Sequence, residues 1–362
     1  MIKIKSIANA EPGIKMAKTY NNLFHKVCSF QNLLRAAQKA QKNKRFKENT
    51  ARFNFELENM LLKLSEELLN RTYRPGSYHR FLVYEPKKRL ISAAPYRDRV
   101  VHHALCNVIE PIFEKTFIYD SYANRAGKGT HAAILRFQEF CRKNKYMLKC
   151  DIKKYFDSID RGILIEMISK KIKDKDTLDL IKKILFGKGD KILEEETGVK
   201  GKEIKGIPLG NLTSQFFANL YLNGLDHFIK EELREKYYIR YVDDFVVFGN
   251  DKERLWNVYE MIKKYLSGLG IELHPVKTRI LPVNQGAEFL GFRIFPEKRL
   301  LKKANFFRFR RRLLKMKNFY HKHPKFDIIK KISQSVLSWV SHAKWGDTAK
   351  LREKLFNEVI FK

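Results

Sequence analysis

Two adjacent aspartates interrupt a stretch of strand-forming residues, and this pattern constrains the fold more than any other feature of the chain. Residues 239–249 read IRYVDDFVVFG, with Asp243 and Asp244 between apolar and aromatic runs. Strand formers on both sides of the pair predict a tight β-hairpin with the acids at its tip. Two carboxylates this close repel, so one keeps its proton unless a cation lies beside them. An ordinary turn is the alternative for an isolated Asp-Asp pair, because Asp is a common turn residue.

The charge balance of the chain indicates a polyanionic partner. Its 362 residues include 73 Lys and Arg against 40 Asp and Glu, a net charge of +33. Folded proteins this basic most often bind nucleic acid. A membrane is the main competitor, but no apolar run approaches the roughly 18 residues of a spanning helix, and the amino terminus lacks the apolar stretch of a secretory signal. The four widely spaced cysteines form no metal-binding pattern, which predicts buried, reduced thiols in a cytoplasmic protein.

The hydrophobic pattern predicts an α+β protein. Strands are expected in a two-stranded unit over 78–95, at 146–151, in the Asp-Asp hairpin and in short segments up to 295; helices are expected over 31–70, 98–115, 212–236 and 251–268. The Gly-rich, charged stretch 187–206 is expected to be a hairpin or a loop. Residues 297–362 are expected to be helical, and they carry 19 Lys and Arg against 5 Asp and Glu. Aromatic residues interleave with these cations, which favours a surface that grips nucleic acid over a merely solvated helix face.

A third carboxylate makes the Asp-Asp pair more than a turn. Asp151 ends the apolar strand YMLKCD, where its side chain can emerge beside a neighbouring hairpin tip. An Asp in this position also commonly caps a helix. Carboxylates on two strands about ninety residues apart are, however, what a two-metal phosphoryl-transfer site requires. Asp and water oxygens suit Mg²⁺, so we expect two Mg²⁺ ions roughly 4 Å apart, for which Mn²⁺ can substitute.

These motifs resemble, in order from about residue 75 to residue 296, those of the reverse transcriptases, which are right-hand polymerases with fingers, palm and thumb. The resemblance implies that Asp151 is the first catalytic aspartate and that YVDD supplies the others. Asp243 is then the direct metal ligand and Asp244 a supporting one. Phe156 matches the family's steric gate, where an aromatic ring collides with a ribonucleotide's 2′-hydroxyl and so favours dNTPs.

The resemblance extends to the residues that hold substrates. EPKKRLISAAP matches the fingers segment that binds the incoming triphosphate, with Arg89 the first candidate and Lys87 and Lys88 next. Lys277, in ELHPVKTRI, is the candidate proton donor to the leaving pyrophosphate, although a surface lysine is an open alternative. Further nucleotide-binding candidates are Leu209, Gly210 and Gln215; candidates for primer or template contact are Lys128, Tyr241, Phe289, Leu290, Gly291, Arg308, Arg310, Arg311 and Arg312. The EFLGFRIF stretch, which resembles the primer grip, can equally belong to the palm core.

The implied domain organisation follows the same family. We expect an N-terminal basic helical extension over 1–70, fingers over 71–145 and a palm over 146–296 with an insertion around 162–205. A basic helical thumb is expected over 297–362. The palm should be built on a small antiparallel sheet, and the fingers and thumb should be mainly helical.

One loop distinguishes among reverse transcriptases. In retroviral and intron-encoded enzymes this loop usually reads Q-G-x-x-x-S-P, whereas here Leu209-Gly210 and Ser214-Gln215 occupy those places. An aliphatic Leu209 removes an amide that would contact the nucleotide, which should loosen discrimination against mispairs. This loop and SYANRAGKGTHAAI (121–134) resemble the reverse transcriptases of diversity-generating retroelements from bacteria and phages.

The subgroup resemblance implies particular partners. Such enzymes copy a template-repeat RNA into cDNA with errors chiefly opposite adenines, and they work with a small basic pentameric accessory variability protein. Template RNA, cDNA or primer, and dNTPs are the expected ligands. The alternatives are a group II intron-like, retron or phage-defence reverse transcriptase, a catalytically inactive RNA-binding scaffold, and a basic protein that merely coats nucleic acid. An inactive polymerase usually loses a catalytic carboxylate, and all three are present here.

Overall fold

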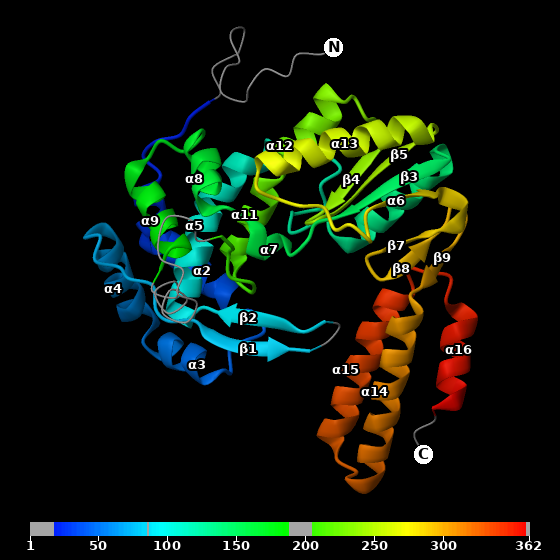
Figure 1. Cartoon of the computed structure of the whole chain (residues 1–362). Coiled ribbons are helices and arrows are strands. Elements are labelled where there is room, and N and C mark those ends of the chain that lie inside the picture. The colour runs from blue at the N-terminus through cyan, green and yellow to red at the C-terminus, as the bar shows by residue number, and fades with distance from the viewer. Residues whose placement is uncertain (1–17, 85–86, 188–204, 360–362) are drawn as a thin grey trace, which may run out of the picture. The chain divides into compact units, whose positions relative to one another are not determined.

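The computed structural model describes residues 18–84, 87–187 and 205–359 (Figure 1). The chain divides into two compact units, residues 1–117 with 154–224, and residues 118–153 with 225–362. Both contain helices and antiparallel strands, as expected for an α+β protein. The predicted stretch 187–206 lies almost wholly outside the described residues. Within the described part, no helix is both long enough and apolar enough to cross a bilayer.

The first unit is mainly helical and is built around α5 (Tyr96–Glu114). Its N-terminal helices are α1 (Phe24–Cys28), α2 (Phe30–Ala40), α3 (Glu48–Phe55) and α4 (Leu57–Leu69). Helix α2 buries Leu33, Ala36, Ala37 and Ala40, which have the i, i+3, i+4, i+7 spacing of one helical face. This face packs along α5. The remaining elements are β1 (His79–Val83), β2 (Arg89–Ala93), α7 (Tyr155–Ser158), α8 (Arg161–Ser169), α9 (Lys175–Leu185) and α11 (Leu212–Tyr221).

The expectation of continuous helix over 31–70 is wrong. The chain leaves the helix after Ala40 and resumes it at Glu48, and Asn43 between them has a positive φ of 60°. Lys42 and Arg45 are three residues apart in this stretch, and so are Lys44 and Lys47. In a helix such like charges would face one another and destabilise it, so the cationic segment forms turns instead.

The second unit contains a four-stranded antiparallel sheet in the order β4–β5–β3–β6. The strands are β3 (Tyr146–Asp151), β4 (Tyr238–Tyr241), β5 (Asp244–Gly249) and β6 (Arg279–Pro282). Met147, Val246 and Phe248 point to one face and join the core around α6 (Thr130–Lys143). A Cβ on Gly249 would point at Leu255 of α13 (Lys252–Gly268), so α13 covers the other face (Figure 1).

A smaller sheet and three basic helices complete the second unit. Strands β7 (Ala287–Phe289), β8 (Phe292–Ile294) and β9 (Arg299–Leu301) form an antiparallel sheet. Helices α14 (Lys303–Lys322), α15 (Phe326–Ala343) and α16 (Ala349–Glu358) follow it. The rings of Phe309 and Trp339 stack at 4.3 Å between α14 and α15. The helical C-terminal region expected from the sequence is therefore present, whereas its designation as a thumb, like the fingers and palm boundaries, stays a prediction.

Other elements, and the cysteines, agree with expectation. The predicted helix over 212–236 is present as α11, α12 (Asn223–His227) and a π-helical turn, η1 (Phe228–Glu232). A 3₁₀ turn, η2 (Val283–Gln285), precedes β7. All four cysteines are buried and free, as predicted.

Two glycines with similar backbone geometry allow a matched test of packing in the second unit. Gly286 (φ 67°) and Gly127 (φ 70°) both lie in the left-handed region, where any other residue is strained by about 1–2 kcal/mol. A Cβ on Gly286 would lie 2.7 Å from the Phe295 ring, whereas a Cβ on Gly127 meets nothing within 4 Å. We therefore expect Gly286→Ala to destabilise the protein by about 1–3 kcal/mol more than Gly127→Ala, as overpacking does.

Equilibrium denaturation of the two variants and the parent chain measures this difference. Equal losses of stability would show that Phe295 moves aside without cost and would contradict the packing argument.

Candidate active site

The pairing of β3 with β5 brings the predicted carboxylates together. In this antiparallel register Asp151 is directly opposite Asp244, and Asp243 lies in the turn before β5. Directly opposite residues point to the same face with their Cβ atoms about 4.5–5.5 Å apart. The hairpin predicted from IRYVDDFVVFG is also confirmed, since β4 pairs with β5 and Tyr241 is opposite Asp244.

The backbone of Asp151 is tied to a segment that follows α13. The His274 amide donates to the Asp151 carbonyl at 2.7 Å, and the Asp151 amide lies 3.4 Å from Thr278 Oγ1. These two contacts hold the stretch 274–278 along the end of β3. Lys277 belongs to that stretch, and its Nζ donates to Asp151 Oδ1 at 2.7 Å. The structure thus places Lys277, chosen from the sequence as a catalytic candidate, in contact with the first predicted aspartate.

A second lysine accompanies Asp244. Lys149 Nζ lies 3.5 Å from Asp244 Oδ2 and also donates to the Glu288 carbonyl. Sequence reasoning missed Lys149, although it precedes Asp151 by two residues in a strand and therefore shares its face. The two carboxylates opposite each other each have an ammonium partner, which answers the need for positive charge beside them.

Burial raises the pKa of Asp244 to about 6. Lys149 opposes this rise, whereas the charges of Asp243 and Asp151 add to it. Asp244 Oδ1 is also buried without a hydrogen-bond partner. A buried, unpaired carboxylate oxygen is costly, and a cation next to it would relieve that cost.

The carboxylates of this site are chemically suited to bind a divalent cation. They offer hard oxygen ligands, which Mg²⁺ prefers, and Mg²⁺ usually takes its other ligands from water and substrate phosphates. In residues 18–84, 87–187 and 205–359, no three His, Cys, Asp or Glu side chains are arranged to hold a metal ion by themselves. A metal ion bound by these carboxylates would therefore need further ligands from water or substrate.

The turn that carries Asp243 has unusual backbone geometry. Val242 has a φ of 57°, which is rare for a β-branched residue. Such conformations persist only where surrounding contacts impose them, and they cluster at functional sites.

The predicted nucleotide-binding segments meet within the first unit. The Ile207 amide donates to the Phe156 carbonyl at 2.9 Å, and the Ser92 amide donates to the Leu209 carbonyl at 2.9 Å. Gly210 has a φ of 117°, and a Cβ there would lie 2.8 Å from Ile91. The loop that contains Leu209 and Gly210 is thus held between α7 and β2, and the close approach at Gly210 requires glycine.

The other nucleotide-binding candidates lie on the same unit. Lys87, Lys88 and Arg89 are exposed at the end of the β1–β2 hairpin, which the sequence predicted, and Gln215 is half-buried in the first turns of α11. Their roles toward a nucleotide stay predictions.

The primer and template candidates are distributed over the second unit. Tyr241 shares a hydrogen bond of 3.1 Å with Thr130, and Lys128 Nζ lies 3.2 Å from the centre of the Tyr119 ring. The Phe289 ring stacks on Phe137 in the core, so only its backbone is left for a primer. Leu290 and Gly291 form a turn with positive φ values. Of the arginines on α14, Arg311 and Arg312 are exposed, Arg308 is half-buried and Arg310 pairs with Glu358.

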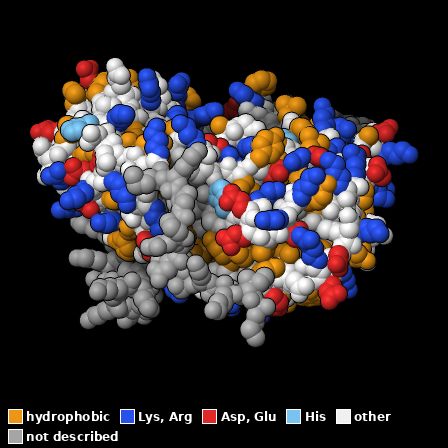
Figure 2. Space-filling view, turned by 90° about the horizontal axis from the view of Figure 1, so that it is seen from above, with side chains coloured by type: hydrophobic (Ala, Val, Ile, Leu, Met, Phe, Trp, Pro, Cys, Tyr) orange, Lys and Arg blue, Asp and Glu red, His pale blue; other side chains and the backbone are white. Residues whose placement is uncertain are grey.

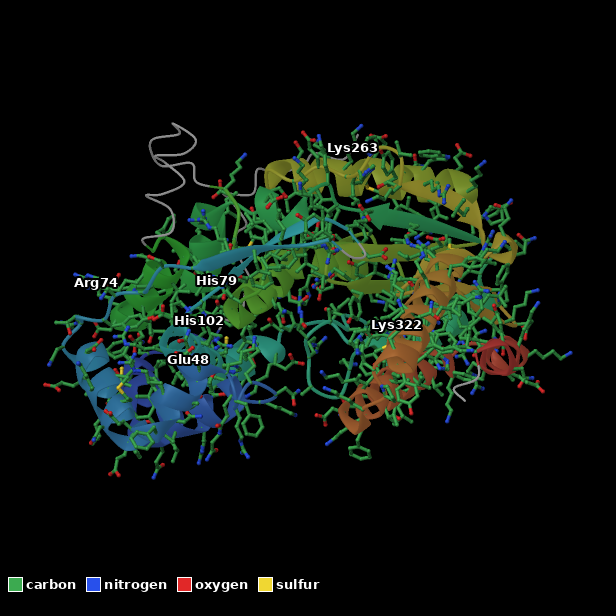
Figure 3. All side chains as sticks on the ribbon, turned by 90° about the horizontal axis from the view of Figure 1, so that it is seen from below. Glu48, Arg74, His79, His102, Lys263 and Lys322 are labelled. Carbon is green, nitrogen blue, oxygen red and sulfur yellow. The ribbon has the colours of Figure 1, made fainter. Side chains whose placement is uncertain are left out.

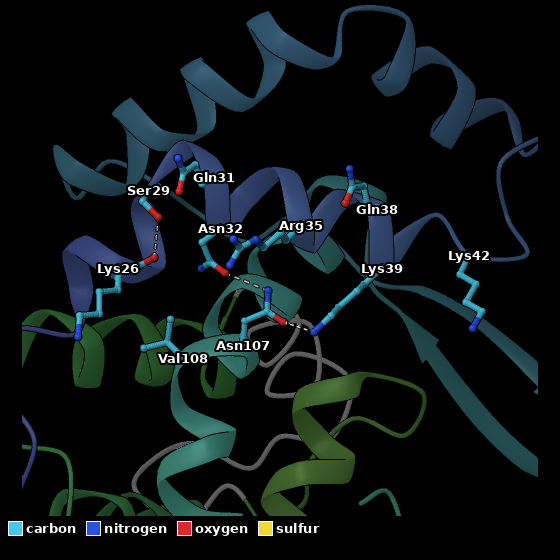
Figure 4. Close-up of a pocket in the computed structure, with 10 residues that line it drawn as sticks. All are labelled: Lys26, Ser29, Gln31, Asn32, Arg35, Gln38, Lys39, Lys42, Asn107 and Val108. Carbon is cyan, nitrogen blue, oxygen red and sulfur yellow. Dashed lines mark hydrogen bonds between the residues drawn. The ribbon is translucent and has the colours of Figure 1, made fainter. Parts of the chain in front are cut away.

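A cavity of about 630 Å³ lies elsewhere, beside α1, α2 and α5 of the first unit. Figure 4 shows its polar lining, in which Lys39 reaches Asn107 and no acidic side chain takes part. None of the residues predicted to bind nucleotide or metal lines it. Its ten lining residues are Lys26, Ser29, Gln31, Asn32, Arg35, Gln38, Lys39, Lys42, Asn107 and Val108; we call it the cationic groove.

Comparison with known proteins identifies the family. The family described as "Reverse transcriptase (RNA-dependent DNA polymerase)" matches residues 84–294, more than half of the chain and all three predicted carboxylates. The chain therefore belongs to the reverse transcriptase family. The expected enzyme class, RNA-directed DNA polymerase, and the expected right-hand polymerase fold are thereby confirmed. The family generally uses divalent metal ions.

Individual relatives are more distant. Protein YkfC of Escherichia coli is 27% identical over 64% of this chain and 70% of its own length. The group II intron-encoded protein LtrA of Lactococcus lactis is 25% identical over 66% of this chain, which covers half of LtrA. Among solved structures, apo telomerase from Candida tropicalis aligns over 82% of this chain and 64% of its own with a TM-score of 0.48 at 13% identity.

The raised pKa of Asp244 predicts a pH dependence of stability in metal-free protein. Protonated Asp244 stabilises the fold at about pH 4, and this contribution is lost as pH rises through about 6. Asp244→Asn removes the titration, so the variant should gain stability over the parent chain as pH rises from 4.5 to 7, by up to about 2 kcal/mol.

Denaturation in EDTA at several pH values measures this gain. Asp179→Asn is the control, because that carboxylate is exposed. A difference between Asp244→Asn and the parent chain that does not change with pH would refute the proposed effect of burial.

Proposed function

We propose that this chain copies an RNA template into cDNA by nucleotidyl transfer at Asp151, Asp243 and Asp244. The observation that carries the proposal is the β3–β5 register, which sets Asp151 opposite Asp244 next to the Asp243 turn. The match of the reverse transcriptase family across residues 84–294 supports the same chemistry.

Each part of the site has a proposed task. The three aspartates hold two divalent cations, Mg²⁺ or Mn²⁺, which when bound lower the pKa of the primer 3′-hydroxyl and neutralise the leaving pyrophosphate. Before substrate binds, Lys277 neutralises Asp151, from which it lies 2.7 Å away. During transfer its ammonium group donates a proton to the pyrophosphate oxygen that leaves. Lys149 stays beside Asp244 and limits repulsion among the carboxylates.

Residues of the first unit are proposed to select the nucleotide. Arg89, with Lys87 and Lys88, binds the triphosphate through charge-assisted hydrogen bonds. The Phe156 ring excludes the 2′-hydroxyl of a ribonucleotide. The hydrogen bonds from Ile207 to Phe156 and from Ser92 to Leu209 support this assignment, because they join the three segments concerned.

Within the family, we propose that the chain serves a diversity-generating retroelement. The supporting feature is the loop in which Leu209-Gly210 and Ser214-Gln215 occupy the Gln-Gly and Ser-Pro places. The aliphatic Leu209 side chain offers no amide to contact the incoming nucleotide. Fewer contacts then fix a correct pair in the transition state, so misincorporation becomes easier. The template would then be a template-repeat RNA, and a small basic pentameric accessory protein would assist. A group II intron-like enzyme is the second candidate, favoured by the similarity to LtrA.

Sequencing of cDNA distinguishes these candidates. With a primed RNA of mixed sequence, dNTPs and Mg²⁺, the parent chain should make cDNA with errors concentrated opposite template adenines. Asp243→Asn should reduce synthesis by at least about 10²-fold, because it removes a charge that stabilises the transition state. The measured quantities are the yield of cDNA and the error frequency at each template base.

The possible outcomes separate chemistry from subgroup. Accurate cDNA would retain the polymerase and favour the intron-like candidate. Equal yield from Asp243→Asn and the parent chain would overturn the assignment of the site. Absence of cDNA, after addition of a candidate accessory protein and native RNA, would favour the inactive scaffold.

We also propose that the cationic groove contacts the RNA backbone. Arg35, Lys39 and Lys42 follow one another at helical spacing along α2 and the turn after it, and Lys26 of α1 adds a fourth positive charge. Lys and Arg side chains are scattered over the face seen in Figure 2, whereas in the cationic groove they line a concave surface together with amide groups that can bond to phosphate or sugar.

Charge removal in the groove tests this contact. Lys39→Gln with Lys42→Gln should weaken RNA binding and reduce the slope of log K against log salt by about 1.4 for a single-stranded RNA. Lys252→Gln with Lys263→Gln on α13, where Figure 3 labels Lys263, changes the net charge equally and is the matched control. Equal effects of the two pairs would show that only net charge matters. Both variants keep the cations of the basic helix α14, which ends at Lys322, labelled in the same figure.

A further inference from the structure

A fully buried ion pair lies next to the turn that carries Asp243. The side chains of Arg240 in β4 and Asp226 in α12 are both 0% exposed. Arg240 Nε donates to Asp226 Oδ1 at 2.7 Å, and Arg240 Nη2 donates to Asp226 Oδ2 at 2.5 Å. These two parallel bonds set the plane of the guanidinium group. The Tyr238 hydroxyl donates a further hydrogen bond to Asp226 Oδ1 at 2.7 Å.

The remaining nitrogen of the guanidinium group, Nη1, bonds to the turn that carries Asp243. Arg240 Nη1 donates to the carbonyl oxygen of Val242 at 3.1 Å. That carbonyl belongs to the peptide plane that leads into Asp243. Holding it therefore limits rotation about Val242, the residue with the strained φ of 57°. The direction in which the chain enters Asp243 depends on this rotation.

The ion pair acts from the face opposite the carboxylates. Arg240 of β4 pairs with Phe245 of β5, whereas Asp151 of β3 pairs with Asp244, the residue before Phe245. Because side chains alternate between the faces of a sheet, Arg240 and Asp244 point in opposite directions. Asp226 neutralises the Arg240 charge, so the guanidinium group does not compete with a cation at the carboxylates.

We propose that Arg240 is a positioning residue for nucleotidyl transfer, which acts by holding the Val242 carbonyl and is itself oriented by its two hydrogen bonds to Asp226. The inference rests on the proposed polymerase function and deepens it. A buried ion pair is weak evidence of a role in stability alone, because apolar residues of similar volume often replace such a pair without loss. The bond to Val242 gives this pair a role that apolar residues cannot reproduce.

Two variants separate positioning from general stability. Arg240→Lys keeps the positive charge beside Asp226, but a lysine has one ammonium group and cannot bond to both Asp226 and Val242 in the same fork geometry. Tyr238→Phe removes a hydrogen bond from the same buried cluster and leaves the Arg240–Val242 bond in place. Single-turnover extension of a primed RNA gives the maximal rate and the apparent dNTP dissociation constant for each.

We expect Arg240→Lys to lower the maximal rate by roughly 10- to 100-fold, as a small misplacement of a reacting group does. Its dNTP dissociation constant should not change, because the predicted triphosphate contacts lie in another segment. Tyr238→Phe should keep the parent rate. Hydrogen exchange of metal-free protein gives a second readout, in which the amides of 242–244 should exchange faster in Arg240→Lys alone.

A third variant covers the case in which Arg240→Lys does not fold. The triple change Tyr238→Phe, Asp226→Leu and Arg240→Met replaces the whole cluster by apolar groups, which often preserves stability. The triple variant lacks the bond to Val242, so we expect it to fold and to extend the primer at a reduced maximal rate. A parent-like rate in the triple variant or in a folded Arg240→Lys would overturn the proposal, as would an equal loss in Tyr238→Phe. If the parent chain made no cDNA, the polymerase function would fail, while exchange at 242–244 would still decide whether Arg240 holds the turn.

Discussion

The pairing of β3 with β5 is the constraint on which the rest of the site depends. Its register sets Asp151 opposite Asp244 and places Lys149 on their face. A shift of one residue would turn every side chain of β3 to the other face. Such a shift would turn Asp151 and Met147 together to the face that α13 covers, and would remove Met147 from the core around α6. The apolar residues of the strand thus hold the carboxylates in position, so the packing of the second unit and its chemistry have a common origin.

Electrostatic balance at the site is achieved on both faces of the sheet. On one face Lys277 and Lys149 neutralise carboxylates that would otherwise repel. On the other face a buried Arg240–Asp226 pair carries no net charge and contacts the turn through hydrogen bonds. The strong net positive charge of the chain is a separate matter, because exposed lysines act over a distance on a polyanion and are screened by salt.

Strain and restraint occur together at the Asp243 turn. A β-branched residue at positive φ is an unlikely choice for a turn that needs only to connect two strands. The Arg240 bond to Val242, the pairing of β4 with β5 and the Tyr241–Thr130 hydrogen bond all converge on this turn. A rigid turn is what catalysis at fixed carboxylates requires, since displacement by about 1 Å can cost two orders of magnitude in rate.

The sequence by itself determined the chemistry and much of the local structure. Strand formers around Asp243 and Asp244 specified the hairpin, and the order of motifs from EPKKR to EFLGF specified the polymerase family. Local patterns failed at 41–47, where repulsion among lysines overrode helical periodicity. Only the tertiary structure decided which side chains accompany the carboxylates. Lys149 and Arg240 occur in quoted motifs and Asp226 in the predicted helix 212–236, yet their partners depend on strand register and on contacts between segments far apart in the chain. A repeat of two or 3.6 residues does not encode such contacts.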